Sequence, residues 1–91
     1  MTIQLIVKGK VQGVYYRASA KEAAERLDIT GQVKNTHTGD VEIIASGNTT
    51  SLDEFINWCK QGPPNAIVKE VIVTNAPDQQ FTSFEIVHGR H

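Results

Sequence analysis

The stretch of residues 7–17 constrains the fold more than any other part of the chain, because a strand pattern ends in it and a helix pattern begins. The first 21 residues contain no Asp or Glu, yet they hold four of the nine Lys and Arg residues. Gly9 and Gly13 can adopt positive φ angles or let an anion come close to the backbone. A helix that starts after this turn directs its unpaired N–H groups and the positive end of its dipole to the same place. Arg17 adds a planar fork that can grip two oxygens of one anion, so the stretch predicts an anion site.

The remaining hydrophobic patterns predict an α+β fold. Alternating or β-branched runs indicate strands at residues 3–7, 31–35, 41–45, 67–73 and 81–87, and helical spacing indicates helices over 16–27 and from 51 to the Gly62-Pro63-Pro64 stop. Ser51 and Glu54 have the spacing of a capping box that would open the second helix. The order predicts a ferredoxin-like βαββαβ sandwich, with two helices on one face of a four- to five-stranded antiparallel sheet. In such a fold Arg17 and Asn35 converge at one edge of the sheet.

Length and composition bound the function. The 91 residues, 40% hydrophobic and 21% charged, predict one soluble domain over residues 1–91, expected to be a monomer. The net charge of −1 argues against a nucleic-acid partner. No apolar run reaches the roughly 18 residues of a membrane span, no signal peptide is visible, and the single Cys59 agrees with a reducing compartment. We therefore expect a cytoplasmic protein with no membrane partner.

Few residues could supply a nucleophile, a metal site or a general acid. Cys59 lies on the apolar stripe of the second predicted helix and is expected to be a buried small hydrophobe. No group of His, Cys, Asp and Glu has metal-ligand spacing, so neither a metal nor another cofactor is expected. His37 lies in a hairpin loop, where solvation is favoured over substrate contact. His88 and His91 belong to a polar tail that is expected to fray.

An anion grip without these groups suits one kind of reaction. An acyl phosphate loses a carboxylate whose conjugate acid has a pKa of about 4, so no proton donor is required when water attacks. An alkyl phosphate ester needs a donor or a metal, because an alkoxide leaves poorly at neutral pH. If the chain is a catalyst, the small-molecule substrate expected from the residues alone is therefore an acyl phosphate.

Two segments resemble the signatures of the acylphosphatase family. Residues 7–17 read Val-x-Gly-x-Val-Gln-Gly-Val-x-Tyr-Arg, which resembles the N-terminal signature, with Tyr16 where the family usually has Phe or Met. Residues 31–47 resemble the second signature, with Gln32 in place of the usual aromatic residue. The resemblance extends to the order of strands and helices over essentially the whole chain. It implies a metal-free hydrolase that splits acyl phosphates into carboxylate and inorganic phosphate.

The resemblance also assigns roles. Arg17 matches the catalytic arginine that binds phosphate, and Asn35 matches the residue that positions the attacking water. Backbone N–H groups of the loop would bind phosphate, from Val11, Gln12, Gly13, Val14, Tyr15 and Tyr16. The Tyr16 ring is expected in the core with a partner for its hydroxyl, and the hydroxyls of Thr36 and Thr38 are expected to steady the loop after Asn35.

Structural alternatives remain open at both catalytic positions. Asn35 could simply form a turn at a strand end, and Arg17 could be a surface residue paired with a nearby acid. At the level of function, a non-catalytic module that binds acyl or carbamoyl phosphate is the main alternative. An RNA-binding domain is a weaker one, because the strands 3–7 and 41–45 contain none of the aromatic residues on which bases stack.

Overall fold

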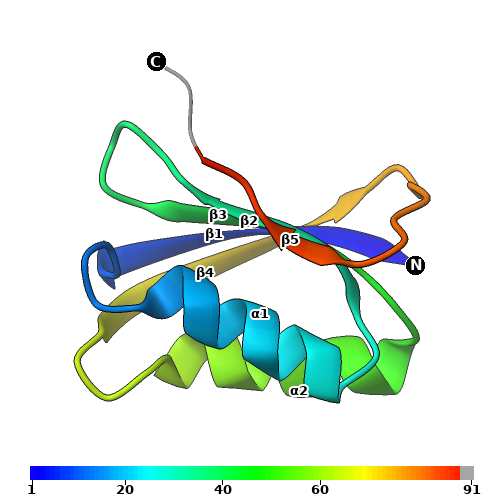
Figure 1. Cartoon of the computed structure of the whole chain (residues 1–91), viewed down its shortest axis with the longest axis horizontal. Coiled ribbons are helices and arrows are strands. Elements are labelled where there is room, and N and C mark those ends of the chain that lie inside the picture. The colour runs from blue at the N-terminus through cyan, green and yellow to red at the C-terminus, as the bar shows by residue number, and fades with distance from the viewer. Residues whose placement is uncertain (89–91) are drawn as a thin grey trace.

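The computed structural model describes residues 1–88 as one sheet with two helices on a single face (Figure 1). The elements are β1 (Thr2–Lys10), α1 (Tyr16–Arg26), β2 (Thr30–Asn35), β3 (Val41–Ser46), α2 (Thr49–Gln61), β4 (Ile67–Ala76) and β5 (Phe84–Ile86). The predicted ferredoxin-like α+β sandwich is therefore confirmed. Both helices lie on the same side of the sheet, and the opposite face of the sheet carries no helix (Figure 1).

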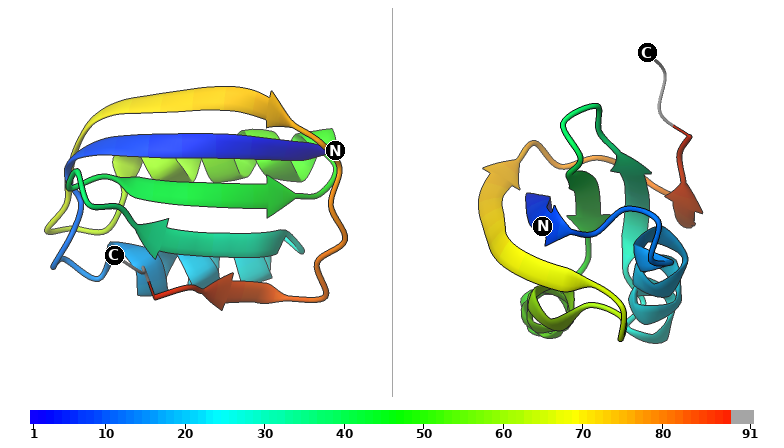
Figure 2. Two further views of the ribbon diagram at one scale, coloured as in Figure 1. Left: turned by 90° about the horizontal axis from the view of Figure 1, so that it is seen from above. Right: turned by 90° about the vertical axis from the view of Figure 1, so that its left-hand side faces the viewer.

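The five strands lie in the order β4-β1-β3-β2-β5, as Figure 2 shows from above the sheet. Three of the four neighbouring pairs are antiparallel, but β5 runs parallel to β2. The prediction of an antiparallel sheet is thus wrong for its last strand, and the sheet is mixed. After β4 at one edge, residues 77–83 cross to the opposite edge, so the chain enters β5 in the direction of β2.

The core lies between the sheet and the helices, and its residues follow the predicted periodicities. Alternate residues of β1 are fully or almost fully buried, namely Ile3, Leu5 and Val7. On α1 the buried residues Ala20, Ala23 and Ala24 let this helix lie close to the sheet, as the sequence predicts. On α2, Leu52, Phe55 and Cys59 face the same core. These residues belong to one hydrophobic cluster.

Several element boundaries differ from the predicted ranges, and those of α2 and β5 have a visible cause. Helix α2 begins at Thr49, because Asn48 is its N-cap and the Asn48 Oδ1 accepts a hydrogen bond from the N–H of Ser51 at 2.8 Å. The predicted capping box, with Ser51 as the cap, is therefore wrong. Strand β5 has three residues instead of the predicted seven, since it pairs with β2 only from Phe84 to Ile86.

Gly9 and Gly31 let neighbouring strands approach closely. Gly9 has a φ of 128° at a register shift between β1 and β4, and a Cβ added there would lie 2.1 Å from the carbonyl oxygen of Ile67. Gly9 therefore has the positive φ that the sequence allows for it, and this conformation permits strand pairing at a bulge. Gly31 has a φ of 146°, and its added Cβ would lie 1.9 Å from the carbonyl oxygen of Ile44.

We expect Gly31→Ala to lower the free energy of unfolding by about 3 kcal/mol, because the methyl group would strike backbone atoms and the residue would keep a strained φ. Urea denaturation measures this loss. Gly39→Ala is the matched control, because Gly39 also has a positive φ but no atom lies within 4 Å of its added Cβ. The control should lose only about 1 kcal/mol. Equal losses in the two variants would contradict the predicted steric clash.

Candidate active site

A pocket of about 390 Å³ lies where the turn after β1, the start of α1 and the ends of β2 and β5 meet. This volume lies within the range of small-molecule sites, roughly 300–1,000 Å³. Its lining residues are Val11, Gly13, Tyr15, Tyr16, Arg17, Ala18, Asn35, Ile86 and His88. The structure thus brings Arg17 and Asn35 to one pocket, as the sequence predicts.

The loop of residues 11–16 has the backbone shape of an anion-binding nest. Gly13 and Tyr15 have φ angles of 74° and 63°, and the residues between and after them do not have positive φ. Alternation of this kind turns successive N–H groups to one side. Within residues 1–88, none of the N–H groups of residues 12–18 donates to a backbone or side-chain acceptor. The loop and the first turn of α1 therefore present a run of unused donors beside the pocket.

Tyr15 has a backbone φ of 63°, a positive value that a non-glycine residue rarely adopts. It is the N-cap of α1, yet its side chain caps nothing and is 80% exposed. The first turn of α1 also contains no acidic side chain. The open N-terminus and the strained Tyr15 backbone favour an anion at this helix end.

Arg17 is the second residue of α1 and lines the pocket. No ion pair or side-chain hydrogen bond joins it to another described residue. By contrast, Arg26 at the other end of the helix pairs with Glu22. Among residues 1–88, Arg17 is therefore not a surface arginine paired with an acid, which was the structural alternative.

Asn35 is the last residue of β2 and makes no side-chain hydrogen bond within the part of the chain that the structure describes. Its Oδ1 is buried and has no partner. The turn after β2 is instead closed by Thr36, whose Oγ1 accepts from the N–H of Asp40 at 3.1 Å and contacts Thr38 Oγ1 at 2.9 Å. The predicted steadying role of the two threonines is confirmed, and the Asn35 side chain contributes no hydrogen bond to this turn among the described residues.

The loop is anchored in the core by Tyr16. Its hydroxyl donates to the carbonyl oxygen of Cys59 on α2 at 2.8 Å, and its ring lies 5.4 Å from that of Trp58 between centroids. Burial raises the pKa of Tyr16 above its ordinary value, and burial raises the pKa of the Cys59 thiol to about 12. The predictions of a core Tyr16 with a hydroxyl partner and of a buried Cys59 are both confirmed.

Sequence reasoning missed three lining residues, Ala18, Ile86 and His88. Because β5 is parallel to β2, and the N–H of Val87 donates to the carbonyl oxygen of Val33 at 2.8 Å, the chain after β5 runs on beside the end of β2. This brings His88, which the sequence placed only in a polar tail, to the lining of the pocket. The same prediction for His91 lies outside the described residues.

Other predicted candidates lie elsewhere. His37 is exposed on the hairpin loop and is not among the lining residues. Gln12 and Val14 do not line the pocket with their side chains, although their N–H groups belong to the nest. Among residues 1–88, no group of three His, Cys, Asp or Glu could hold a metal ion. No helix in that range has the length and apolarity needed to cross a bilayer.

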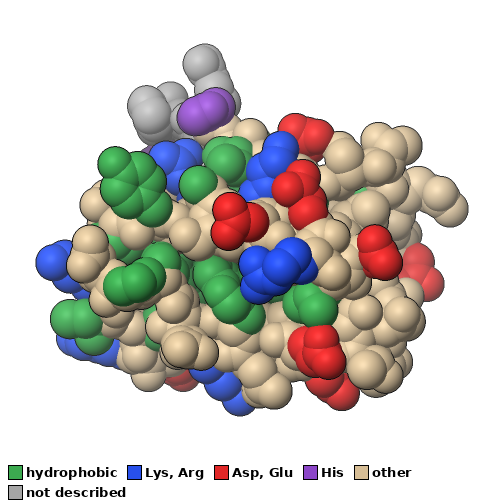
Figure 3. All heavy atoms as spheres, turned by 60° about the horizontal axis from the view of Figure 1, so that its bottom comes forward, with side chains coloured by type: hydrophobic (Ala, Val, Ile, Leu, Met, Phe, Trp, Pro, Cys, Tyr) green, Lys and Arg blue, Asp and Glu red, His purple; other side chains and the backbone are tan. Residues whose placement is uncertain are grey.

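The charge distribution agrees with an anion site. On the face shown in Figure 3, most acidic side chains lie towards the right, away from the left-hand end where α1 begins, and basic side chains are present at that end. The first 21 residues contain no acid, but in the folded chain one of their cations has an acidic partner, since Lys8 Nζ lies 2.9 Å from Asp40 Oδ2.

The fold and the pocket define a class, a small α+β domain with a pocket at the start of its first helix, lined by an arginine and an asparagine among others. Residues 3–86 match the family model for acylphosphatase. An acylphosphatase from Marinobacter nauticus is 47% identical over 85 residues, which cover 92% of each chain. The solved structure of an acylphosphatase from Coxiella burnetii has a TM-score of 0.92 and 38% identity, and covers 94% of this chain and 90% of that one. The solved structure of an acylphosphatase from Bacillus subtilis has a TM-score of 0.91 and 34% identity, and covers 94% of this chain and 97% of that one. The chain therefore belongs to the acylphosphatase family.

Proposed function

We propose that this chain hydrolyses acyl phosphates, with Arg17 and the N–H groups of the 11–16 loop holding the phosphoryl group and Asn35 orienting the attacking water. The observation that carries the proposal is that two polar side chains without a partner among the described residues line the same pocket. Arg17 has no acidic partner and Asn35 has no hydrogen-bond partner among the described residues. Polar groups left unpaired at such a site are expected to be used by substrate.

Each group suits its role. The N–H nest and the guanidinium stabilise the negative charge on the phosphoryl oxygens as it shifts during transfer. The Asn35 amide has no hydrogen bond to lose by turning, so it can present its oxygen to a water molecule and accept a proton of that water in a hydrogen bond. An amide carries no charge that would repel the phosphoryl group.

The reaction then needs one displacement. The water oxygen forms a bond to phosphorus while the bond from phosphorus to the acyl oxygen breaks. The carboxylate leaves with the bonding electron pair, and the proton lost by water passes to a phosphate oxygen or to solvent. Because the leaving carboxylate is a weak base with a conjugate pKa of about 4, the mechanism requires no general acid.

We expect hydrolysis of benzoyl phosphate to be unchanged by excess EDTA, because the proposed groups are side chains and amides and no step uses a metal. Phosphate release measured with and without the chelator tests this. An alkyl phosphate ester such as glycerol phosphate should be turned over at least about 10³-fold more slowly, since its alkoxide leaves poorly. Loss of activity in EDTA that is restored by a divalent cation would contradict the proposed mechanism, and a folded, inactive wild type would favour the binding-module alternative.

We also propose that the chain acts as a single-domain, monomeric enzyme of the cytoplasm. A single buried cluster supports one domain over residues 1–91, and the free, buried Cys59 suits a reducing compartment. The edge strand β4 exposes Lys69 and Glu70, and charged side chains on an edge strand oppose pairing with a second copy. Light scattering on the purified protein tests the expected monomeric mass.

A further inference from the structure

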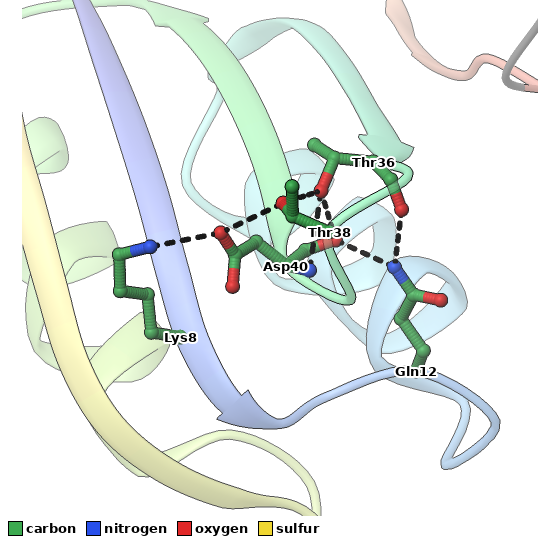
Figure 4. Close-up of polar contacts among 5 residues, drawn as sticks. All are labelled: Lys8, Gln12, Thr36, Thr38 and Asp40. Carbon is green, nitrogen blue, oxygen red and sulfur yellow. Dashed lines mark hydrogen bonds and ion pairs between the residues drawn. The ribbon is translucent and has the colours of Figure 1, made fainter.

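The side chain of Gln12 joins the 11–16 loop to the hairpin loop of residues 36–40 (Figure 4). Its Nε2 donates to the carbonyl oxygen of Thr36 at 2.9 Å and to that of Asp40 at 2.8 Å. A glutamine amide nitrogen has two N–H groups, so both of its donors are used here. The contact therefore lies between the phosphate-binding loop and the residue that directly follows Asn35.

The two acceptor residues, Thr36 and Asp40, lie at the base of the hairpin loop, where its two ends meet. The N–H of Thr36 donates to the carbonyl oxygen of Asp40 at 3.0 Å, and the N–H of Asp40 donates to Thr36 Oγ1 at 3.1 Å. Gln12 thus donates hydrogen bonds to both residues at the base of the hairpin loop, Thr36 and Asp40, which are already joined by a backbone hydrogen bond. A shift of the hairpin loop relative to the 11–16 loop would break both of its hydrogen bonds.

Asp40 is also held from the opposite side. Its Oδ2 lies 2.9 Å from Lys8 Nζ on β1 and accepts from Thr38 Oγ1 at 3.2 Å. The hydrogen bond from Lys8, with a smaller contribution from Thr38, lowers the pKa of Asp40 against the opposing effect of desolvation. Figure 4 shows that Asp40 links Lys8 to Gln12, because its side chain contacts Lys8 and Thr38 while its backbone carbonyl oxygen accepts from Gln12.

We propose that Gln12 acts through its side chain as a positioning residue, which fixes Asn35, and hence the attacking water, relative to the bound phosphoryl group. The inference rests on the proposed function. The phosphoryl group is held by N–H groups and Arg17, and none of these depends on the Gln12 amide. Misplacement of reacting groups by about 1 Å can cost roughly 10²-fold in rate. Loss of the Gln12 side-chain amide should therefore affect the rate of turnover and leave phosphate affinity nearly unchanged.

Gln12→Met tests the proposal, because methionine has a similar length and no charge but cannot donate the two hydrogen bonds. We expect kcat for benzoyl phosphate to fall by at least about tenfold, while Ki for inorganic phosphate stays within about twofold of the wild-type value. Gln4→Met is the matched control, since Gln4 Nε2 also donates a hydrogen bond to a residue distant in sequence, Glu42 Oε2 at 2.7 Å, but Gln4 does not line the pocket. The control should keep the wild-type kcat.

Amide hydrogen exchange provides a readout apart from activity. The Thr36 N–H, which is bonded to Asp40, should exchange faster in Gln12→Met than in the wild type and at the wild-type rate in Gln4→Met. An unchanged kcat, an unchanged Thr36 exchange rate, or a parallel loss of kcat and phosphate affinity in Gln12→Met would overturn the inference alone. A wild type that fails to hydrolyse acyl phosphates would overturn the proposed function, and the inference with it.

Discussion

Replacing Arg17 by alanine is expected to lower kcat/KM for benzoyl phosphate by about 10³-fold, which corresponds to about 4 kcal/mol of transition-state stabilisation. The reason is that the guanidinium is the one charged side chain of α1 that lines the pocket among the described residues, and no acid competes for it. Affinity for inorganic phosphate should fall as well, because the same group holds substrate and product. Steady-state kinetics and inhibition by phosphate measure both effects.

Arg26→Ala is the matched control for Arg17→Ala. Arg26 lies on the same helix, its side chain is 61% exposed, and its only described ion pair is to Glu22 in the preceding turn. Such a pair contributes only a few tenths of a kcal/mol, so this variant should retain wild-type activity. Arg17→Lys should recover only part of the loss, since an ammonium group lacks the planar fork. An Arg17→Ala enzyme with more than a tenth of wild-type activity would contradict the assigned role.

Asn35→Ala is expected to lower kcat by about 10²–10³-fold without lowering the free energy of unfolding. Activity falls because no other lining amide can orient the water. Stability is kept because the side chain makes no hydrogen bond to a described residue, and the substitution removes a buried oxygen that has no partner. Activity and urea denaturation measured on the same preparation give both quantities.

Asn57→Ala controls for the loss of an asparagine side chain, because Asn57 is exposed on α2 and lies outside the pocket. It should change neither kcat nor stability appreciably. A variant Asn35→Ala that loses more than about 1 kcal/mol of stability while keeping its activity would mean that Asn35 has a structural role. That outcome would remove the water-orienting assignment and leave the phosphate-binding groups as they are.

The parts of the fold that the sequence predicted correctly are those with a strong local pattern. Ile3, Leu5 and Val7 alternate with polar or half-buried residues, and the alanines of α1 recur at helical spacing, so their buried faces follow from periodicity. The parallel direction of β5 could not be predicted in this way, because strand direction depends on where residues 77–83 cross the molecule. The predicted cap at Ser51 failed for a related reason, since Asn48 supplies an equally suitable side chain three residues earlier.

In the candidate site, too, the residues with a local sequence motif were predicted, and the features that depend on the tertiary fold were not. Arg17, Asn35 and the 11–16 loop were visible as motifs, whereas the left-handed conformation of Tyr15 was not, because a tyrosine gives no local signal for a positive φ. His88 was missed because its place beside Asn35 depends on the parallel pairing of β5 with β2. The double hydrogen bond of Gln12 spans 24 and 28 residues in sequence, so no local rule predicts it.

The N–H groups of residues 12–18, which have no acceptor within residues 1–88, would couple the stability of the protein to the ions around it if they bind phosphate as proposed. An anion that occupies these donors in the folded chain, and has no site in the unfolded chain, stabilises the fold by RT ln(1 + [L]/Kd), or about 2.7 kcal/mol at a hundred times Kd. The melting temperature should therefore rise with inorganic phosphate in the buffer. In a cell, the resistance of this chain to proteases would vary with the local supply of phosphate.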